Sequence, residues 1–383
     1  MTDVRLTVVG NPGNRRVRLF TDAALAGGLA APTVLPWRDL LAGAAPPPAD
    51  TLVRVDSPGE DAEVDRLLRG AATPAEHGEI VGLAAGHAGL RRALDRLASG
   101  GATLLNQPAD IVTMCDKRRC HARLDAAGVP VPPALPEVTG YAELRAAMRA
   151  AGWTRVFVKP AHGSSASGVL ALAVNGTRIV ATTPVEREDG RLFNSLRVRR
   201  YTDEGDVAAI VDRLAPEGLH VERWLPKAGL ADRVVDLRVV VVAGRPTHAV
   251  VRAGRGPITN LHLGNARGDL AALRAAAGPA HWAAAMTTCE QVAACFPDTL
   301  HVAVDLMFLA GWARHAVAEV NAFGDLLPGV LADGRDTYAE QVRALLAGWR
   351  PTAGANGPGP AGAGANGPWP VGAGARREAT CVS

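Results

Sequence analysis

The sequence predicts an α/β protein in which a helix-covered parallel sheet comes first and a mainly β region follows. Two observations support this fold class. Over the first hundred or so residues, short β-rich segments alternate with segments of helical periodicity, the pattern of an open parallel sheet. From about Trp153 to Pro328, β-rich segments dominate. With 383 residues, the chain is long enough for two or three domains and a sizeable buried core.

Turn signals bound the elements of the first region, and the first strand stops at Gly10-Asn11-Pro12-Gly13. The expected strands are Val4–Val9, Thr33–Leu35, Leu52–Val55 and Thr103–Leu105. The expected helices are Arg15–Leu29, Asp61–Leu68, Glu79–Leu97 and Ile111–Ala127. The last helix carries Asp116 and Lys117 and ends at Gly128-Val129-Pro130, because glycine and proline favour helix termination.

Composition and charge are those of an ordinary globular protein, with 48% hydrophobic and 21% charged residues. The net charge of +3 is small and its signs are interspersed, which argues against a nucleic-acid binder. No apolar run approaches the ~20 residues of a membrane span, and no signal-peptide pattern precedes the first strand. Five cysteines, an odd number, fit reduced thiols. We therefore expect a soluble cytoplasmic protein that binds neither nucleic acid nor membrane.

Three segments leave alternatives open. The turn Gly10–Arg16 lacks the G-x-G-x-x-G order of dinucleotide-binding turns. It is either a plain strand-to-helix turn or part of a substrate site, because loops after parallel strands bind ligands. The same alternatives hold for Asp56–Glu60, which offers a serine hydroxyl and N–H groups at a helix start. Cys115, Cys120 and His121 match no common zinc spacing, so we expect ordinary packing there.

A single lysine precedes a loop of small residues. Lys159 ends a buried-looking strand, and the loop Gly163–Gly168, which includes Ser164 and Ser165, follows. Small residues let backbone N–H groups converge on an anion, and one lysine can neutralise a phosphate charge. The order differs from that of a P-loop, because the lysine precedes the glycines and no helix follows. The segment predicts a phosphate site, with a plain β-hairpin and soluble turn as the alternative.

Two arginines belong to an expected hairpin formed by Val235–Val242 and His248–Arg252. Asp236 and Arg238 share one face by the period of two, and pairing about the turn places Arg252 roughly opposite Arg238. Like charges that face each other cost stability unless an anion lies between them. The forked donors of two arginines suit a triphosphate. A solvated outer face is the alternative.

Two carboxylates lie opposite each other in a second expected hairpin, whose strands Val302–Leu309 and His315–Asn321 are strongly apolar. Pairing about the turn sets Asp305 against Glu319, with Asn321 two residues further on the same face. Two buried carboxylates side by side are unfavourable unless a cation neutralises them. Mg²⁺ prefers oxygen ligands and fits these three side chains together with nucleotide phosphates. We predict a metal site, with a structural carboxylate pair as the alternative.

In this order the features resemble the ATP-grasp superfamily over roughly Asn106 to Gly329. The resemblance implies an ATP-grasp fold preceded by a Rossmann-like parallel-sheet domain. Leu105-Asn106 followed by Asp116-Lys117 is similar to the family's entry to its central domain, whose lysine reaches the nucleotide phosphates. Lys159 is similar to the family's second lysine, on the phosphate and adenine side. Gly163–Gly168 is similar to the loop that closes over the phosphates.

The resemblance assigns further roles. The segment His220–Pro226 is similar to the hinge whose backbone reads the adenine edge, and Asp236 falls where the family's acid holds the ribose hydroxyls. Arg252 and Thr259–Asn265 are similar to the segment near the γ-phosphate, although Asn265 replaces its second glycine. The hinge residues implied are Glu222, Arg223, Trp224 and Leu225. The metal ligands implied are Asp305, Glu319 and Asn321.

The pattern Asp236-Leu237-Arg238 with Asn260–Asn265 is closer to the glutathione-synthetase-like and peptide-glutamate-ligating branch of the family. In the D-alanine–D-alanine ligase branch an arginine precedes the metal aspartate by two positions. Ala303 occupies that place here, which weakens that assignment.

The resemblance implies an ADP-forming carboxylate–amine ligase that uses ATP and Mg²⁺, or Mn²⁺ in its place, and forms an acyl phosphate. Arg238, Arg252 and Asn260 would orient the carboxylate and stabilise developing charge. His162 either assists proton transfer or only spaces the loop. A phosphotransferase or acyl-phosphate-forming enzyme, and an inactive nucleotide-binding module, are the alternatives. The substrates would be small-molecule or peptide carboxylates and amines, and homodimers are common in the family.

We divide the chain into an N-terminal Rossmann-like domain (1–105), a central lobe with the small-residue loop (106–215), a large lobe with the metal site (216–350) and a tail (351–383). We expect the tail to be disordered. It is mostly Ala, Gly, Pro and Asn, and Ala-Gly-Ala-Asn-Gly-Pro occurs at 353–358 and again at 363–368. Such a composition cannot bury enough apolar surface to offset the entropy of ordering.

Overall fold

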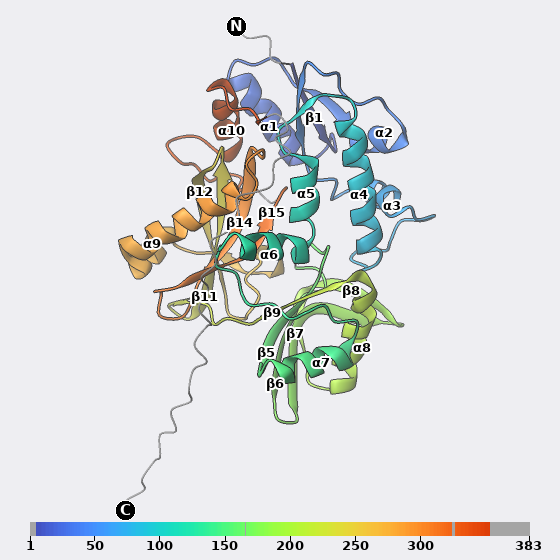
Figure 1. Cartoon of the computed structure of the whole chain (residues 1–383), viewed down its shortest axis with the longest axis vertical. Helices are drawn as coiled ribbons and strands as arrows, with labels where there is room; N and C mark the ends of the chain where they lie inside the picture. The colour runs from blue at the N-terminus through green and yellow to red at the C-terminus, as the bar shows by residue number, and fades with distance from the viewer. Residues whose placement is uncertain (1–4, 165, 324–325, 353–383) are drawn as a thin grey trace, which may run out of the picture.

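The structure is a computed structural model that describes residues 5–164, 166–323 and 326–352. Figure 1 shows its sheets along the long axis, with the N-terminal sheet at the top and the sheet formed by β5–β9 at the bottom. Most of the predicted disordered tail lies outside the described residues, as does Ser165. Across the described ranges, no helix is long and apolar enough to cross a membrane.

The first sheet is the parallel sheet that the sequence predicts, with strand order β2-β1-β3-β4. Its strands are β1 (Arg5–Gly10), β2 (Thr33–Pro36), β3 (Thr51–Val55) and β4 (Thr103–Leu104). Its helices are α1 (Arg15–Ala26), α2 (Trp37–Ala42), α3 (Ala62–Arg69) and α4 (Leu83–Ala98). Asn14 and Asp61 accept backbone N–H groups at the starts of α1 and α3, which satisfies donors that have no partner inside the helix.

The single helix predicted over Ile111–Ala127 is wrong, because the segment forms two helices. α5 spans Pro108–Met114 and α6 spans Lys117–Ala126. The side chain of Asp116 accepts two backbone N–H groups of the next turn and so caps α6. Helical periodicity continues across the break, so the pattern alone did not reveal it. Lys117 therefore stands at the first position of a helix.

The second sheet is antiparallel, with strand order β8-β7-β6-β5-β9. Its strands are β5 (Arg155–Pro160), β6 (Leu170–Asn175), β7 (Arg178–Glu188), β8 (Arg191–Tyr201) and β9 (Leu219–Arg223). Two helices, α7 (Tyr141–Ala150) and α8 (Glu204–Leu214), and the 3₁₀ turn η1 (Ala215–Glu217) accompany it. β9 begins after the predicted division at 215, yet it pairs with β5 along its whole length.

The third sheet is also antiparallel, with strand order β13-β12-β11-β14-β15 and with β10 paired to β11. Its strands are β10 (Gly229–Leu230), β11 (Arg233–Val242), β12 (Arg245–Gly254), β13 (Ala266–Arg267), β14 (His301–Phe308) and β15 (His315–Asn321). The 3₁₀ turn η2 (Leu261–Leu263) and the helix α10 (Thr337–Leu346) belong to the same region. A long helix, α9 (Leu270–Ala294), lies within the stretch where the sequence indicated mainly strands; it is kinked at Gly278-Pro279.

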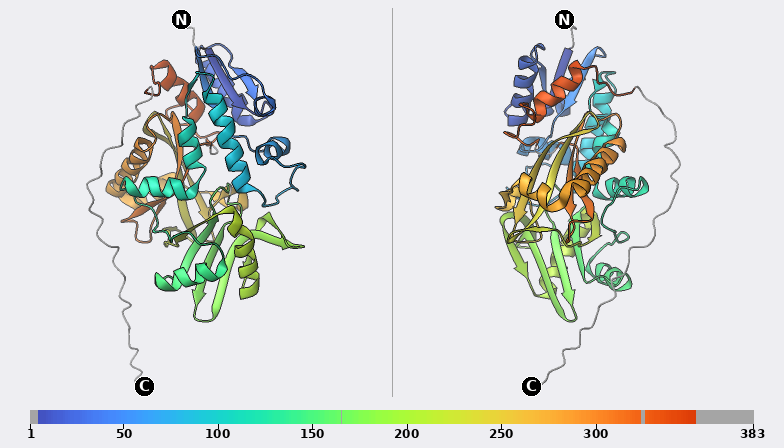
Figure 2. Two further views of the ribbon diagram at one scale, coloured as in Figure 1. Left: turned by 45° about the vertical axis from the view of Figure 1, so that its right-hand side comes forward. Right: turned by 90° about the vertical axis from the view of Figure 1, so that its left-hand side faces the viewer.

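The first and third sheets share continuous apolar cores, whereas the second sheet has a core of its own. α9 packs against β11, β12 and β14, and α10 packs against α1 (Figure 2). Strands from the second sheet (β5, β9) and the third sheet (β12, β14, β15) therefore face each other across the boundary between two separately packed bodies, and the main cavity lies there.

The register of the third sheet overturns one prediction and confirms another. Arg252 pairs with Asp236 and not with Arg238, so the expected facing of like charges is wrong. A two-residue turn at Ala243-Gly244 and a bulge at Thr247 shift the pairing by two residues. Asp305 lies opposite Glu319, as predicted, and a bulge on β15 keeps that alignment.

Candidate active site

A cavity between the second and third sheets encloses about 750 Å³ of space free of protein atoms, including its open mouth. Apolar side chains line one part of its wall, namely Phe157, Val169, Leu225, Ile258 and Met307. Charged side chains line the remainder, namely Lys117, Lys159, Glu222, Arg223, Lys227, Arg252, Asp305 and Glu319. Five cationic groups against three carboxylates make this wall suited to an anionic ligand.

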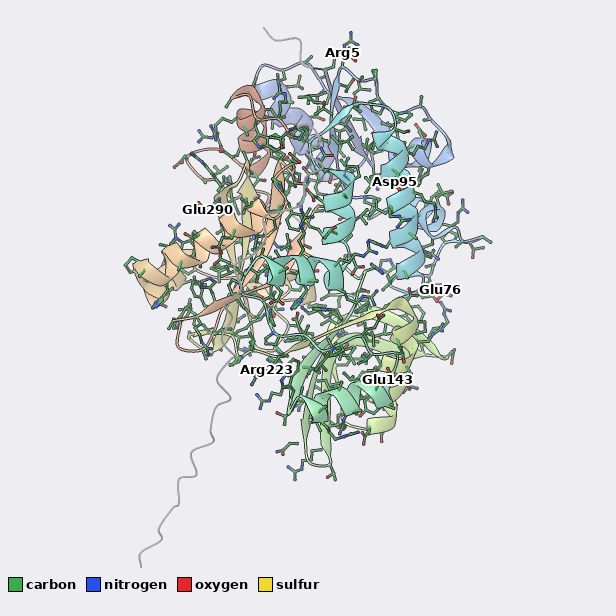
Figure 3. All side chains as sticks on the ribbon, in the orientation of Figure 1. Arg5, Glu76, Asp95, Glu143, Arg223 and Glu290 are labelled. Carbon is green, nitrogen blue, oxygen red and sulfur yellow. The ribbon has the colours of Figure 1, made fainter. Side chains whose placement is uncertain are left out.

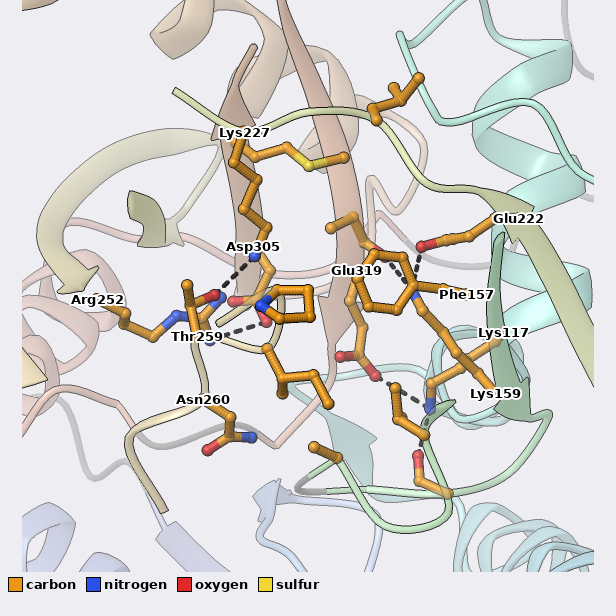
Figure 4. A pocket seen from close by; sticks show the side chains of 18 of the residues that line it. Lys117, Phe157, Lys159, Glu222, Lys227, Arg252, Thr259, Asn260, Asp305 and Glu319 are labelled. Atoms are coloured by element: carbon orange, nitrogen blue, oxygen red, sulfur yellow. Dashed lines mark hydrogen bonds and ion pairs between the residues drawn. The ribbon is translucent and has the colours of Figure 1, made fainter. Parts of the chain in front are cut away.

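Figure 4 shows the charged groups on two sides of the cavity, with Lys117, Lys159 and Glu222 on one side and Lys227 and Arg252 on the other. The pairs Lys159–Glu222 and Lys117–Glu319 belong to the first side. Figure 3 labels Arg223 at the end of β9, where the second sheet meets the third.

Asp305 is buried and held by two arginines. Arg238 Nη2 and Arg252 Nη1 donate to its Oδ2 at 2.9 and 3.1 Å, and Arg238 Nε donates to its Oδ1. Burial opposes ionisation, but the two guanidinium groups hold the pKa of Asp305 below its usual range. The sequence predicted two arginines converging on an anion, and the anion that they bind in the structure is this carboxylate.

Glu319 is less buried than the sequence suggested, since its side chain keeps 31% exposure. Lys117 Nζ lies 3.1 Å from Glu319 Oε1 and also donates to the carbonyl of Gly163. The two carboxylates therefore do not require a metal for charge neutralisation, because arginine and lysine already neutralise them.

The donor set itself still fits Mg²⁺. Asp305 and Glu319 supply oxygen atoms at directly opposed positions, and Asn321 follows on the same strand. The amide nitrogen of Asn321 is buried and lacks a hydrogen-bond partner among the described residues. A buried polar atom without a partner is unfavourable, and turning the amide would present an oxygen instead. These residues therefore fit a hard cation with oxygen ligands.

Lys159 forms a buried ion pair with Glu222, to which His220 Nε2 also comes within 3.4 Å. Burial works against the charged carboxylate, but Lys159 and His220 lower the pKa of Glu222 to about 2. In the hinge, Arg223 N–H donates to Pro133 O at 2.8 Å and Trp224 N–H to Arg155 O at 3.1 Å. Because these two N–H groups already donate to backbone carbonyls of the protein, other backbone groups of the hinge would have to make the contacts to a ligand.

Asp236 lies behind the cavity wall and is 4% exposed. Arg252 Nε donates to its Oδ1 at 2.7 Å, while Lys227 and Thr259 donate to its Oδ2. Lys227 does line the cavity, and no motif in the sequence pointed to it. Its position is set by the turn after β9 and by an isolated bridge to Leu309, at the far end of β14.

No protein-family model and no curated protein matches the sequence. Solved structures do match the fold. D-cycloserine synthetase DcsG aligns over 89% of this chain and 98% of its own with TM-score 0.55 and 16% identity. The ATP-grasp ligase PsnB with a minimal precursor aligns over 90% and 99%, with TM-score 0.53 and 17% identity. N5-carboxyaminoimidazole synthase from Aspergillus clavatus aligns over 91% and 78%, with TM-score 0.51 and 14% identity. The chain has the ATP-grasp fold.

The cavity brings together ten of the residues predicted from the sequence. Those that line it are Lys117, Lys159, Gly163, Glu222, Arg223, Leu225, Arg252, Asn260, Asp305 and Glu319. Other described candidates do not line it, namely Ser164, Gly168, Trp224, Asp236, Arg238 and Asn321. Residues that line it but were not singled out include Phe157, Lys227, Thr259 and Met307. Thr259 and Met307 lie inside the segments Thr259–Asn265 and Val302–Leu309, so proximity to the predicted site residues of those segments was the available signal.

The small-residue loop at the cavity is shaped by its glycines. Gly168 has φ +71°, and a Cβ there would come within 2.6 Å of Pro160. Ser167 N–H donates to Ser164 O at 2.8 Å, which closes a tight turn. His162, at the start of the loop, stacks on His87 of α4 at 4.1 Å between ring centroids. Burial and the neighbouring His87 lower the pKa of His162.

The remaining candidates lie away from this cavity or form internal contacts. The turns after β1 and β3 are tied together, because Asn11 Nδ2 donates to the carbonyls of Pro58 and Gly59. Burial raises the pKa of both Cys115 and Cys120 to about 12, which keeps these thiols protonated and poorly suited to a metal. Among the residues that the structure describes, no cluster of three His, Cys, Asp or Glu side chains is arranged for a metal.

Proposed function

We propose that the chain is an ATP- and Mg²⁺-dependent ligase that joins a carboxylate to an amine through an acyl phosphate. One observation carries this proposal. Asp305 and Glu319, directly opposed on neighbouring strands, share a cavity wall with Lys117, Lys159 and Arg252. Two adjacent carboxylates amid an excess of cations suit a ligand that is itself a complex of a divalent cation and a polyanion.

The arrangement of apolar and cationic side chains supports one orientation of the nucleotide in the cavity. Phe157, Leu225 and Met307 provide an apolar region for a base. Lys117 and Lys159 are the cations available to the phosphates, and the backbone of the Gly163–Gly168 loop would approach them. Hinge groups other than the occupied N–H groups of Arg223 and Trp224 would contact the edge of the base.

The metal would be held by Asp305 and Glu319, with Asn321 completing the set. When bound, Mg²⁺ supplies charge neutralisation at the transferring phosphoryl group. Arg238 and Arg252 hold the Asp305 carboxylate in place. Arg252 and Asn260, which also line the cavity, would orient the substrate carboxylate.

In the proposed reaction, a carboxylate oxygen of the substrate attacks the γ-phosphorus and the bond to the β-phosphate bridging oxygen breaks, which yields an acyl phosphate and ADP. An amine then attacks the acyl carbon, inorganic phosphate leaves, and the amine loses a proton as the amide forms. The cationic wall stabilises negative charge as it develops in both steps.

The structural neighbours support the reaction type at the level of the fold. One is described as an ATP-grasp ligase with a phosphomimetic precursor, Mg and ADP, at TM-score 0.52 and 17% identity over 90% of this chain and 98% of its own. Another is described as a synthetase of D-cycloserine. Because one description names a precursor and the other the small molecule D-cycloserine, we propose no narrower substrate class than small-molecule or peptide carboxylates and amines, and a homodimer remains our expectation.

The test is ADP and phosphate release by the purified chain with ATP, Mg²⁺ and a matrix of carboxylic acids and amines. A ligase requires both an acid and an amine for release of phosphate. ADP formation that needs an acid alone would indicate an acyl-phosphate-forming or phosphotransferase activity. Saturable ATP binding without ADP formation across a broad matrix would indicate a nucleotide-binding module. Glu319→Gln is the matched control for each positive result.

A further inference from the structure

Lys227 lines the cavity together with apolar side chains and the carboxylates Asp305 and Glu319. It follows Leu225 by two residues, and its ammonium group lies 2.7 Å from Asp236 Oδ2 and 2.7 Å from Thr259 Oγ1. Asp236 is in turn joined to Arg252, which reaches Asp305. Leu225, Lys227 and Asp305 line the same cavity. In a nucleotide whose base lies against Leu225 and whose phosphates lie toward Asp305, the sugar would lie near Lys227.

The acid that the sequence assigned to the sugar is not accessible in this arrangement. Asp236 is 4% exposed, does not line the cavity, and accepts from Arg252, Lys227 and Thr259 together. A carboxylate with three donors has little acceptor capacity left for two ribose hydroxyls. The ammonium group of Lys227, which lines the cavity, already pairs with Asp236 Oδ2 at 2.7 Å, so a sugar would compete with it for this carboxylate.

An ammonium group carries three N–H donors. Lys227 donates two of them to Asp236 and Thr259. The tetrahedral geometry of the ammonium group points the third donor away from these two partners. Lys227 is already paired with Asp236, so this third donor does not require an anionic ligand. A neutral hydroxyl oxygen is a suitable acceptor.

We propose that Lys227 is the specificity-determining residue for the sugar: it donates a hydrogen bond to a ribose hydroxyl oxygen of the bound nucleotide, and Asp236 is the positioning residue that holds it. The inference rests on the proposed function, because it takes the ligand to be ATP. It assigns a role to a lysine for which the sequence offered no motif.

The test compares dissociation constants of the full chain for ATP, 2′-deoxy-ATP and 3′-deoxy-ATP in the presence of Mg²⁺, measured by titration calorimetry. For the wild type we expect one deoxy analogue to bind roughly tenfold more weakly, since a hydrogen bond from a charged donor is lost. For Lys227→Met we expect ATP and that analogue to bind within about twofold of each other. The control is Arg255→Met, which removes an exposed arginine paired only at the surface with Asp232 and should preserve the discrimination.

Each outcome has one meaning. If Lys227→Met keeps or increases the wild-type ratio of the dissociation constants for the deoxy analogue and ATP, Lys227 is only a structural ion-pair partner that shields Asp236. The inference is then overturned. Equal binding of all three nucleotides by the wild type overturns it as well. If the wild type binds no nucleotide at millimolar concentration, the proposed function itself fails. Lys227→Arg retains the charge and serves as a further control. Thermal unfolding of every variant separates loss of the contact from loss of the fold.

Discussion

Replacing Asp236 by Asn is the perturbation that most directly tests the charge network behind the cavity. Asp236 and Asp305 are surrounded by Lys227, Arg252 and Arg238. The substitution leaves one carboxylate against three cations at almost unchanged volume. Any loss of stability therefore reports charge and hydrogen bonding and not packing.

The size of the effect follows from the two ion pairs at 2.7 Å. At an effective dielectric constant of about 20, each such pair contributes roughly 6 kcal/mol before desolvation is subtracted. Desolvation removes most of this, and breaking one partner of a buried pair costs about 3–5 kcal/mol. The amide of Asn still offers one acceptor oxygen, so we expect a loss near the lower limit, about 3 kcal/mol.

The assay is urea unfolding, followed by circular dichroism and tryptophan fluorescence, on a double-mutant cycle with Lys227→Met. Lys227→Met alone should cost less, because Asp236 keeps Arg252 and Thr259. The double variant should be more stable than Asp236→Asn alone, because it lacks one unpaired cation. If the free energy of unfolding of Asp236→Asn lies within about 0.5 kcal/mol of the wild-type value, the reasoning is refuted. Strictly additive effects of the two substitutions in the double-mutant cycle would refute it as well.

The pH dependence supplies a second readout for the same variant. Although burial opposes ionisation, Arg252 and Lys227 hold the pKa of Asp236 far below its usual range. A carboxylate whose pKa is depressed by folding stabilises the native state above the unfolded pKa of about 3.9 and loses this contribution as pH falls toward the folded value. The difference in stability between wild type and Asp236→Asn should therefore shrink as the pH is lowered from 5 to 3.

Three further predictions concern the site and its surroundings. Glu319→Gln should lower turnover by about 10²–10³-fold while the unfolding midpoint stays near that of wild type, because its side chain is 31% exposed; wild-type turnover would remove Glu319 from the metal site. Lys159→Ala should weaken ATP binding by at least about tenfold and also destabilise the fold, since it leaves Glu222 buried without its ammonium partner; an unchanged dissociation constant would count against the phosphate role. Burial lowers the pKa of His301 to about 3, so NMR should find its ring neutral at pH 5, and stability should fall by about 1.4 kcal/mol per pH unit below the ordinary histidine pKa near 6.5; a ring that titrates above pH 5 would contradict this.

Local sequence patterns were sufficient to predict the fold class and part of the candidate site. The alternation of short strands and helices predicts the parallel sheet β2-β1-β3-β4, because each strand-to-helix unit is decided by residues close in sequence. The opposition of Asp305 and Glu319 was also predicted from the short turn that joins their strands, although the bulge on β15 that keeps the two residues opposed is not visible in the sequence. Spacing in a hairpin then decides which side chains meet.

Other features of the site depended on the tertiary structure. The bulge at Thr247 moved Arg252 opposite Asp236, and a one-residue insertion of this kind is not visible in an apolar alternation. The place of Lys227 depends on β9, β11 and β14, which are distant in sequence. The sequence by itself determined which residue types stand on the strands of the ATP-grasp fold. Only the tertiary structure decided which charges are paired, because an ion pair depends on distances between segments that folding brings together.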